Sequence, residues 1–143
     1  MRPNILSMTA WLFVLVSATP AFAKDLIGTK WVTANGSGII KLEPCGQKLC
    51  GKITGPGPKA DKNGAQTDVK NPNPALRSRP IVGLAILTGF SDQGKGKLTG
   101  GQIYDPTEGK SYRSELRLKP DGKLEVKGCI GPICVSQIWT PLP

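Results

Sequence analysis

The 143-residue sequence carries 19 Lys and Arg residues against 10 Asp and Glu residues, a formal net charge of +9, and no histidine. The absence of histidine excludes Ser-His-Asp and Cys-His catalytic arrangements as well as histidine-ligated zinc sites. The basic residues are spread along the whole chain and are not clustered among aromatic residues, so nucleic-acid binding is not expected.

The first 23 residues have the features of a bacterial export signal. Arg2 supplies a positive end, the segment 11–16 an apolar core, and Ala21-Phe22-Ala23 a small-x-small cleavage site. The apolar segment is short for a membrane span, and no cysteine follows it for lipid attachment. We therefore expect a signal peptide over residues 1–23, with an uncleaved anchor as the less favoured alternative. The product would be periplasmic or secreted, with no transmembrane anchor after cleavage.

Residues 24–143 have the length of one domain with a modest core. They contain two copies of one cysteine spacing, Cys45 with Cys50 and Cys129 with Cys134. An even number of cysteines in an exported chain favours disulfides, for which three connectivities exist. We favour the two local pairs because each brackets four residues of turn character between strand-like runs. A four-cysteine zinc site is the rival interpretation, and the spacing and the oxidising compartment disfavour it, so no metal is expected.

The mature chain alternates apolar and polar residues over short runs and contains no convincing helix. Tight turns at Asn35-Gly36, 105–109 and 120–122 join these runs. About eight strands in this pattern predict an all-β fold, a single antiparallel up-and-down β-barrel, because closure removes exposed strand edges. Closure would also bring the first and last strands together, so Trp31 and Trp139 should be buried near one another.

One long loop, residues 55–80, interrupts the tight turns. It is rich in Pro, Gly, Lys and Asn, and Asn73-Pro74 predicts the start of a single helical turn. Loops of this length are usually functional or disordered, so both a lid over the barrel and a solvated spacer remain open. Its basic residues Lys70, Arg77 and Arg79 form the densest candidate contact for an anionic partner.

An ordered series of motifs covers nearly the whole mature chain. The motifs are Gly28-Thr-Lys-Trp31, Cys45-Gly-x-x-Leu-Cys50-Gly-Lys-Ile53, Asp68-x-x-Asn71-Pro72, Leu76-Arg-x-Arg79-Pro-Ile-Val-Gly-Leu84, Gly101-x-Ile-Tyr104-Asp-Pro-x-x-Gly109-Lys-x-Tyr112 and Gln137-Ile-Trp139-Thr140. In these motifs the chain resembles the secreted bacterial family named domain of unknown function 2147. The resemblance implies a lipocalin-like barrel of exported proteins with no established activity. Pro141 stands where the family commonly has a basic residue.

The most favoured function is the binding of a small apolar or amphipathic ligand inside the barrel or at its mouth. Strand parity places polar groups among apolar neighbours on one face, as an orienting pocket needs. The candidate ligand-binding residues are Gln102, Tyr104, Tyr112, Gln137 and Trp139, with Ser114 on the same face, and Arg77 and Arg79 for an acidic head group. A barrel filled by its own side chains is the structural alternative.

Two other functions are less favoured by the sequence. The chain could be an envelope interaction module that holds an anionic envelope component with its basic exterior and the 55–80 loop. Asp105 and Glu108 could form an acid/base pair, but turn formation alone explains both residues, so no catalytic residue is assigned. Asp61-Lys-Asn63-Gly64 lacks the ligands of a calcium loop. We expect a monomer that is not an enzyme and has no cofactor.

Overall fold

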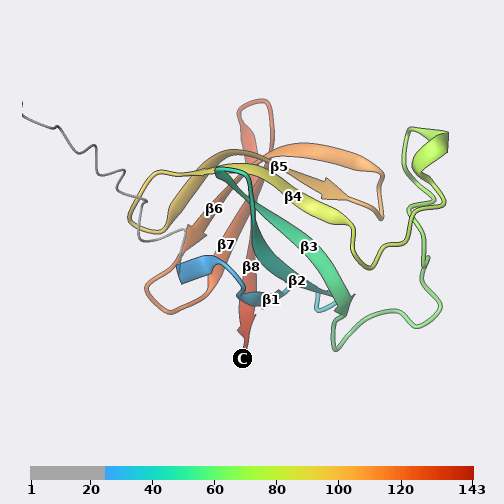
Figure 1. Ribbon diagram of the computed structural model, residues 1–143, viewed down its shortest axis with the longest axis horizontal. Helices are drawn as coiled ribbons and strands as arrows, with labels where there is room; N and C mark the ends of the chain where they lie inside the picture. Colours follow the sequence, from blue (N-terminus) through green and yellow to red (C-terminus); the bar gives the residue numbers. More distant parts are fainter. Residues whose placement is uncertain (1–24) are drawn as a thin grey trace, which may run out of the picture.

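The computed structural model describes residues 25–143, so the predicted signal peptide lies outside the described residues. Eight antiparallel strands close into one barrel, in which each strand pairs with the next and the last with the first (Figure 1). The strands are β1 (Lys30–Val32), β2 (Gly38–Cys45), β3 (Lys48–Pro56), β4 (Ala85–Asp92), β5 (Lys97–Asp105), β6 (Lys110–Leu118), β7 (Leu124–Ile130) and β8 (Ile133–Leu142). The predicted up-and-down barrel is confirmed.

The strand directions give the barrel two different ends. One end, which we call the mouth, carries the β1–β2 turn, the loop 57–84, the β5–β6 turn and the β7–β8 turn. The opposite end, the base, carries the remaining turns together with the start of β1 and the end of β8. In Figure 1 the β7–β8 hairpin rises at the top and the C-terminus lies at the bottom. The long loop therefore lies at the same end as the β5–β6 turn.

Two buried tryptophans lie at the seam, the place where β1 pairs with β8 to close the barrel. Trp31 pairs with Pro141 across β1 and β8, and Trp139 stands two residues away on the same face as Pro141. Such diagonal neighbours lie within reach of one another when the side chains are aromatic. Trp31 is 3% exposed and Trp139 is 1% exposed. The predicted burial of both tryptophans on adjacent strands is confirmed.

Side chains fill the interior of the barrel toward the base. The fully buried apolar side chains are Trp139, Phe90, Ile40, Leu42, Leu87, Leu98, Leu116, Leu124 and Val126. The Phe90 ring packs directly on Gly101, where an added Cβ would lie 2.5 Å from the ring. Any larger residue at that position would displace the ring, so the core depends on this close approach.

A bulge in β5 reverses its side-chain parity. Leu98 pairs with Leu116, but after a register shift Gly101 pairs with Ser114, so both glycine and leucine face inward although they are three residues apart. Gly100, with φ +76, supplies the extra residue. Gln102 and Tyr104 consequently face outward. The expectation that they share a face with Tyr112 and Gln137 is wrong, because it requires side chains to alternate between the two faces along all of β5, and the bulge interrupts this alternation.

Both predicted disulfides are present, one at each end. Cys45 bonds to Cys50 across the β2–β3 turn at the base, and Cys129 bonds to Cys134 across the β7–β8 turn at the mouth. By loop-closure entropy, such short loops contribute about 2 kcal/mol each.

The long loop contains the predicted helical turn as a 3₁₀ helix, η1 (Pro74–Leu76). The Asn73 side chain accepts a hydrogen bond from the Ala75 backbone and caps it. Strand β4 begins at Ala85 and not at Ile81 as the apolar run suggested, because a turn closed by Leu84 N–H to Ile81 C=O precedes it. Within residues 25–143, no helix has the length and hydropathy needed to cross a bilayer.

We expect Trp139→Ala to lower the free energy of unfolding by about 3–5 kcal/mol, the usual cost of removing a buried aromatic side chain. Its neighbour Ile138, which is 36% exposed, provides the control, since Ile138→Ala removes far less buried surface. Urea unfolding followed by circular dichroism measures both variants. Equal losses for the two would contradict the assignment of Trp139 to the seam.

Candidate functional site

The mouth of the barrel holds a pocket of about 330 Å³ on the inner face of strands β5 to β8. Its lining residues are Ile103, Asp105, Glu108, Tyr112, Val126, Gly128, Ile130, Ile133, Val135 and Gln137. Most are apolar; Asp105, Glu108 and Tyr112 lie at or beside the β5–β6 turn, and Gln137 lies on β8. This is the distribution of a small-molecule site, in which apolar walls carry a few placed polar groups.

The floor of the pocket is apolar and includes a glycine, Gly128. Val126, 1% exposed, forms the boundary with the filled core. A Cβ added at Gly128 would lie 3.7 Å from the Ile103 side chain and 3.8 Å from the Tyr112 side chain, both ordinary contacts. A Cβ at this position would therefore fit against these two side chains, and a larger side chain there would take up part of the pocket.

The outer wall is the β7–β8 hairpin, which extends beyond the rest of the barrel (Figure 1). Strand β8 pairs with β1 only through Thr140–Leu142, so among the described residues no strand covers the β1 side of 133–139. Ile130, Ile133 and Val135 are 69%, 71% and 67% exposed. The pocket is thus an open cup with an exposed apolar wall rather than an enclosed cavity.

The rim of the pocket carries two carboxylates. Asp105 accepts hydrogen bonds from the backbone and the hydroxyl of Thr107, at 2.8 and 2.6 Å, which shape the β5–β6 turn. Glu108 accepts a hydrogen bond from the Tyr112 hydroxyl. That hydrogen bond, followed by burial and by the charges of Glu108 and Asp105, raises the pKa of Tyr112 above its ordinary value. The phenol therefore stays protonated at neutral pH.

A buried carboxylate anchors the long loop to the outside of β5. Asp68 is 0% exposed and accepts hydrogen bonds from the Tyr104 hydroxyl at 2.6 Å, Asn71 Nδ2 at 2.8 Å and Arg79 Nε at 2.9 Å. The Arg79 guanidinium also makes an ion pair with it and lies 5.9 Å from the centre of the Tyr104 ring. Tyr104 and Arg79 thus hold the loop in place.

The ionisation of this cluster follows from its geometry. Burial alone would raise the pKa of Asp68, but the hydrogen bonds from Tyr104, Asn71 and Arg79, with the charge of Arg79, hold it below its ordinary value. Burial and the hydrogen bond to Asp68 raise the pKa of Tyr104. At neutral pH the cluster therefore consists of a carboxylate, a neutral phenol and a guanidinium.

A second contact docks the loop on the β5–β6 turn. Gly109, with φ +69, lies so close to the loop that an added Cβ would stand 1.9 Å from the Lys70 carbonyl oxygen. Only glycine tolerates both this backbone conformation and this contact. The loop therefore braces the turn that carries Asp105 and Glu108.

The structure brings together only some of the predicted ligand-binding residues. Tyr112 and Gln137 line the pocket, and Trp139 lies below it, donating from Nε1 to Gln137 Oε1 at 3.2 Å. Tyr104 and Arg79 belong to the loop anchor, and Arg77 Nε donates to the Asn71 carbonyl at 2.8 Å. Gln102 is exposed on the outer face. The loop lies at the mouth but contributes no residue to the pocket lining.

The residues that sequence reasoning missed are Asp68 and Asn71 in the anchor and Ile103 and Gly128 in the floor. The first two appeared only as members of a motif, because an acid in a polar loop carries no sign of burial. A glycine pair at 100–101 within a predicted strand was the available signal for the bulge that turns Ile103 inward.

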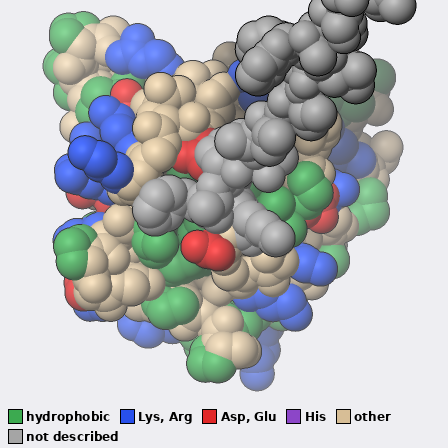
Figure 2. All heavy atoms as spheres, turned by 60° about the vertical axis from the view of Figure 1, so that its left-hand side comes forward, with side chains coloured by type: hydrophobic (Ala, Val, Ile, Leu, Met, Phe, Trp, Pro, Cys, Tyr) green, Lys and Arg blue, Asp and Glu red, His purple; other side chains and the backbone are tan. Residues whose placement is uncertain are grey.

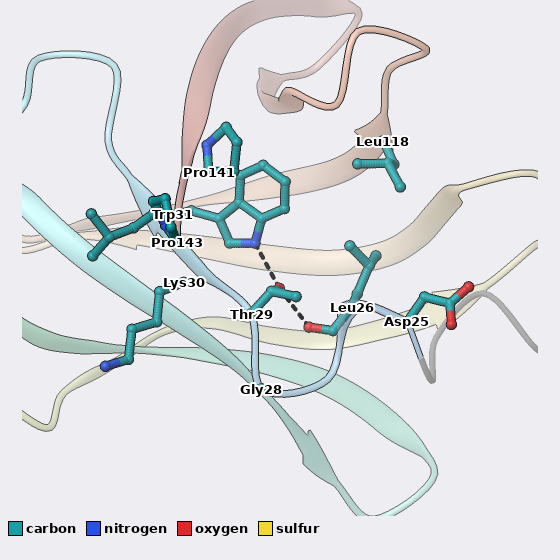
Figure 3. A pocket seen from close by; sticks show the side chains of 10 residues that line it. Asp25, Leu26, Gly28, Thr29, Lys30, Trp31, Leu118, Pro141 and Pro143 are labelled. Atoms are coloured by element: carbon teal, nitrogen blue, oxygen red, sulfur yellow. Dashed lines mark hydrogen bonds between the residues drawn. The ribbon is translucent and has the colours of Figure 1, made fainter.

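A second hollow, of about 440 Å³, lies at the base between the two ends of the described chain (Figure 3). There Trp31 Nε1 donates to Thr29 Oγ1 at 2.9 Å, and Thr29 Oγ1 donates to the Leu26 carbonyl at 2.6 Å. Pro141 lies beside the indole. It stands at the position where the family commonly has a basic residue. The polar groups of this hollow thus hydrogen-bond to one another. For this reason we take the mouth pocket, and not this hollow, as the candidate site.

On the face shown in Figure 2, the charged side chains do not form one patch. Lys and Arg side chains there form separate groups with apolar and acidic side chains between them. Within residues 25–143, no group of three or more His, Cys, Asp or Glu side chains is placed to hold a metal ion.

Comparisons with known proteins give one family and one similar structure. The family described as "Uncharacterized protein conserved in bacteria (DUF2147)" matches residues 29–141. A solved structure titled "Protein HP1028 from the human pathogen Helicobacter pylori belongs to the lipocalin family" is 25% identical, with a TM-score of 0.72, and the match covers 82% of this chain and 83% of that one. No curated protein matches the sequence significantly.

We expect Asp68→Asn to loosen the loop, with faster amide hydrogen exchange over residues 67–81 at neutral pH. Leaving buried donors without their charged acceptor typically costs about 1–3 kcal/mol. Because the folded pKa of Asp68 is lowered, its contribution in the wild type is complete above the unfolded value of 3.8 and is lost as the pH falls through the folded value. The variant should lack this acid transition. Asp61→Asn, in an exposed turn of the same loop, is the control, and matching behaviour of the two would contradict the anchor.

We expect Gly109→Ala to detach the loop from the β5–β6 turn. Gly122→Ala is the matched control, since Gly122 has a similar φ of +80 but no atom within 4 Å of an added Cβ. Both variants pay the cost of the left-handed backbone, and only the first adds the collision with Lys70. Thermal unfolding and loop hydrogen exchange should therefore change more for Gly109→Ala, and equal changes would rule out the docking contact.

Proposed function

Because this chain belongs to the bacterial family DUF2147 and folds as a lipocalin-like barrel, we propose that it is an exported binding protein. Its ligand is a small, partly apolar molecule held in the mouth pocket. Its compartment is the periplasm or the exterior, which the two disulfides support, since such bonds persist in oxidising environments.

The observation that carries this proposal is the contrast between the two ends of the barrel interior. Toward the base the interior is filled, with Phe90 packed on Gly101. Toward the mouth, beyond the buried Val126, the same inner face continues over Ile103 and Gly128, which are only partly buried. The volume of about 330 Å³ is at the small end of the usual range for ligand sites. The ligand is therefore a small molecule rather than a long acyl chain.

The exposed wall supplies the driving force for binding. Ile130, Ile133 and Val135 are each about two-thirds exposed, and a ligand seated in the cup would remove part of their surface from water. Burial of apolar surface stabilises a complex by roughly 25 cal/mol per Å² before the costs of association are subtracted. The Cys129–Cys134 disulfide links the two strands of this hairpin close to its turn.

The loop 57–84 supports the site without closing it. Its anchor on Tyr104 and its contact with Gly109 both lie on the β5–β6 hairpin, whose turn forms the rim. We assign it the role of a brace for Asp105 and Glu108, in place of the lid that was considered from the sequence.

A second candidate function is docking to an envelope component. The exposed apolar tip of the β7–β8 hairpin and the cationic exterior support it, because such surfaces attract anionic polymers and membranes. Docking of this kind would use the hairpin tip and the outer surface, and not the pocket floor at Gly128. It should therefore be insensitive to a substitution that fills the pocket, which separates the two functions.

We expect Gly128→Leu to abolish binding of neutral apolar probes, because a Cβ at this position meets only side chains at ordinary distances and the rest of the leucine would extend into the pocket. The probes are 1-octanol, followed by calorimetry, and N-phenyl-1-naphthylamine, followed by fluorescence. Gly55→Leu, at a strand position with no atom within 4 Å of an added Cβ, is the matched control and should bind as the wild type does. Mass spectrometry of natively purified protein then identifies the natural ligand. Unchanged probe binding by Gly128→Leu would refute the pocket as the site.

A further inference from the structure

We infer that the mouth pocket selects molecules with a cationic group, such as an alkylammonium, over anionic molecules of the same length. This inference rests on the proposed function, since it specifies the ligand of the same pocket. It reverses the expectation from the sequence, in which Arg77 or Arg79 would bind an acidic head group.

The charges that line the pocket are negative. Asp105 and Glu108 are its carboxylates, and no Lys or Arg is among its lining residues. Both carboxylates act on the Tyr112 hydroxyl, which lies between the rim and the apolar floor. A protein with a net charge of +9 thus presents a locally acidic site at its mouth.

The nearby Lys and Arg side chains either bond to other groups or lie outside the pocket. Arg79 is paired with Asp68, and Arg77 donates to the Asn71 carbonyl. Arg113, on the outer face of β6, donates to the Gly131 carbonyl at 2.8 Å. Lys70, whose carbonyl packs on Gly109, is exposed and is not among the lining residues. Lys110 is the remaining cation at the mouth end of the β5–β6 hairpin. It stands opposite Asp105, is exposed, and in the described part of the chain forms no ion pair with either rim carboxylate.

An alkylammonium fits this arrangement with both of its parts. Its N–H groups would donate to the free lone pairs of Asp105 and Glu108, and such charge-assisted hydrogen bonds are stronger than neutral ones. The Tyr112 ring offers a π-face to the cation, and the alkyl chain would lie over Ile103 and Val126. An alkyl carboxylate in the same pose would place its charge against two carboxylates at a distance too short for salt to screen fully.

Three probes of equal chain length separate apolar binding from charge selection: octylammonium, 1-octanol and octanoate. Each competes with N-phenyl-1-naphthylamine for the wild-type protein at neutral pH and physiological salt. We expect octylammonium to bind about tenfold more tightly than octanoate, with 1-octanol between them, a ratio that corresponds to about 1.4 kcal/mol.

Two conservative variants test the carboxylates without removing their structural hydrogen bonds. Asp105→Asn keeps the acceptor oxygen used by Thr107, and Glu108→Gln keeps an acceptor for the Tyr112 hydroxyl. The double variant should lose the preference for octylammonium while still binding 1-octanol. Asp121→Asn is the matched control. Asp121 accepts a backbone hydrogen bond in a turn at the base, so its substitution removes one negative charge far from the pocket.

The outcomes distinguish this inference from the function on which it rests. Binding of 1-octanol with equal or tighter binding of octanoate than of octylammonium would overturn the charge selection and leave the apolar site intact. Failure of all three probes would overturn both. A preference for octylammonium that survives the double variant, or that disappears in Asp121→Asn, would show that the rim carboxylates are not its source and would also overturn the inference.

Discussion

The shortness of strand β1 determines both ends of this barrel. Only Lys30–Val32 bridges β8 to β2, and the pairing with β8 stops at Thr140. Around that seam, Trp31 and Trp139 close the interior and the base becomes a packed core. Above it, β8 continues from 139 back to 133 without a neighbour on the β1 side, so the inner face of the sheet opens into a pocket. A longer β1 would cover this wall.

Much of the fold could be predicted because its signals are local. Asn35-Gly36, the two cysteine spacings and the alternation of β7 each depend on a few adjacent residues. The structure has both disulfides and the strand, and it has a turn at Asn35-Gly36 that spans residues 33–37 and not two residues alone. The candidate site was harder because it depends on parity across β5. One bulge at Gly100 turns Ile103 inward and Tyr104 outward, which divides the predicted site between a pocket and a loop anchor. A glycine pair indicates a bulge but does not give the register that follows it.

Overall charge was a poor guide to the chemistry of the site. The excess of Lys and Arg concerns the exterior, where solvated side chains contribute to solubility and to attraction at long range. The pocket is governed by the few groups within a Debye length, and the turn 105–109 places two acids there. From the sequence, the composition of that turn was explained by turn formation alone. Asp105 does shape the turn through Thr107, and the same geometry directs its charge to the pocket rim.

The residues that hold the long loop are adjacent in the sequence to the two rim carboxylates. The loop can therefore affect binding without contacting the ligand. Gly109, which packs on the Lys70 carbonyl, is the residue after Glu108, and Tyr104, which bonds to Asp68, is the residue before Asp105. Each rim carboxylate therefore has a covalent neighbour held by the loop. If the loop detaches, the β5–β6 turn gains freedom and the two charges lose their fixed spacing. The anchor should therefore influence charge selectivity more than the affinity for neutral molecules, because the apolar floor lies on the inner face of β5 and β7, whereas the loop contacts the outer face of β5 and the β5–β6 turn.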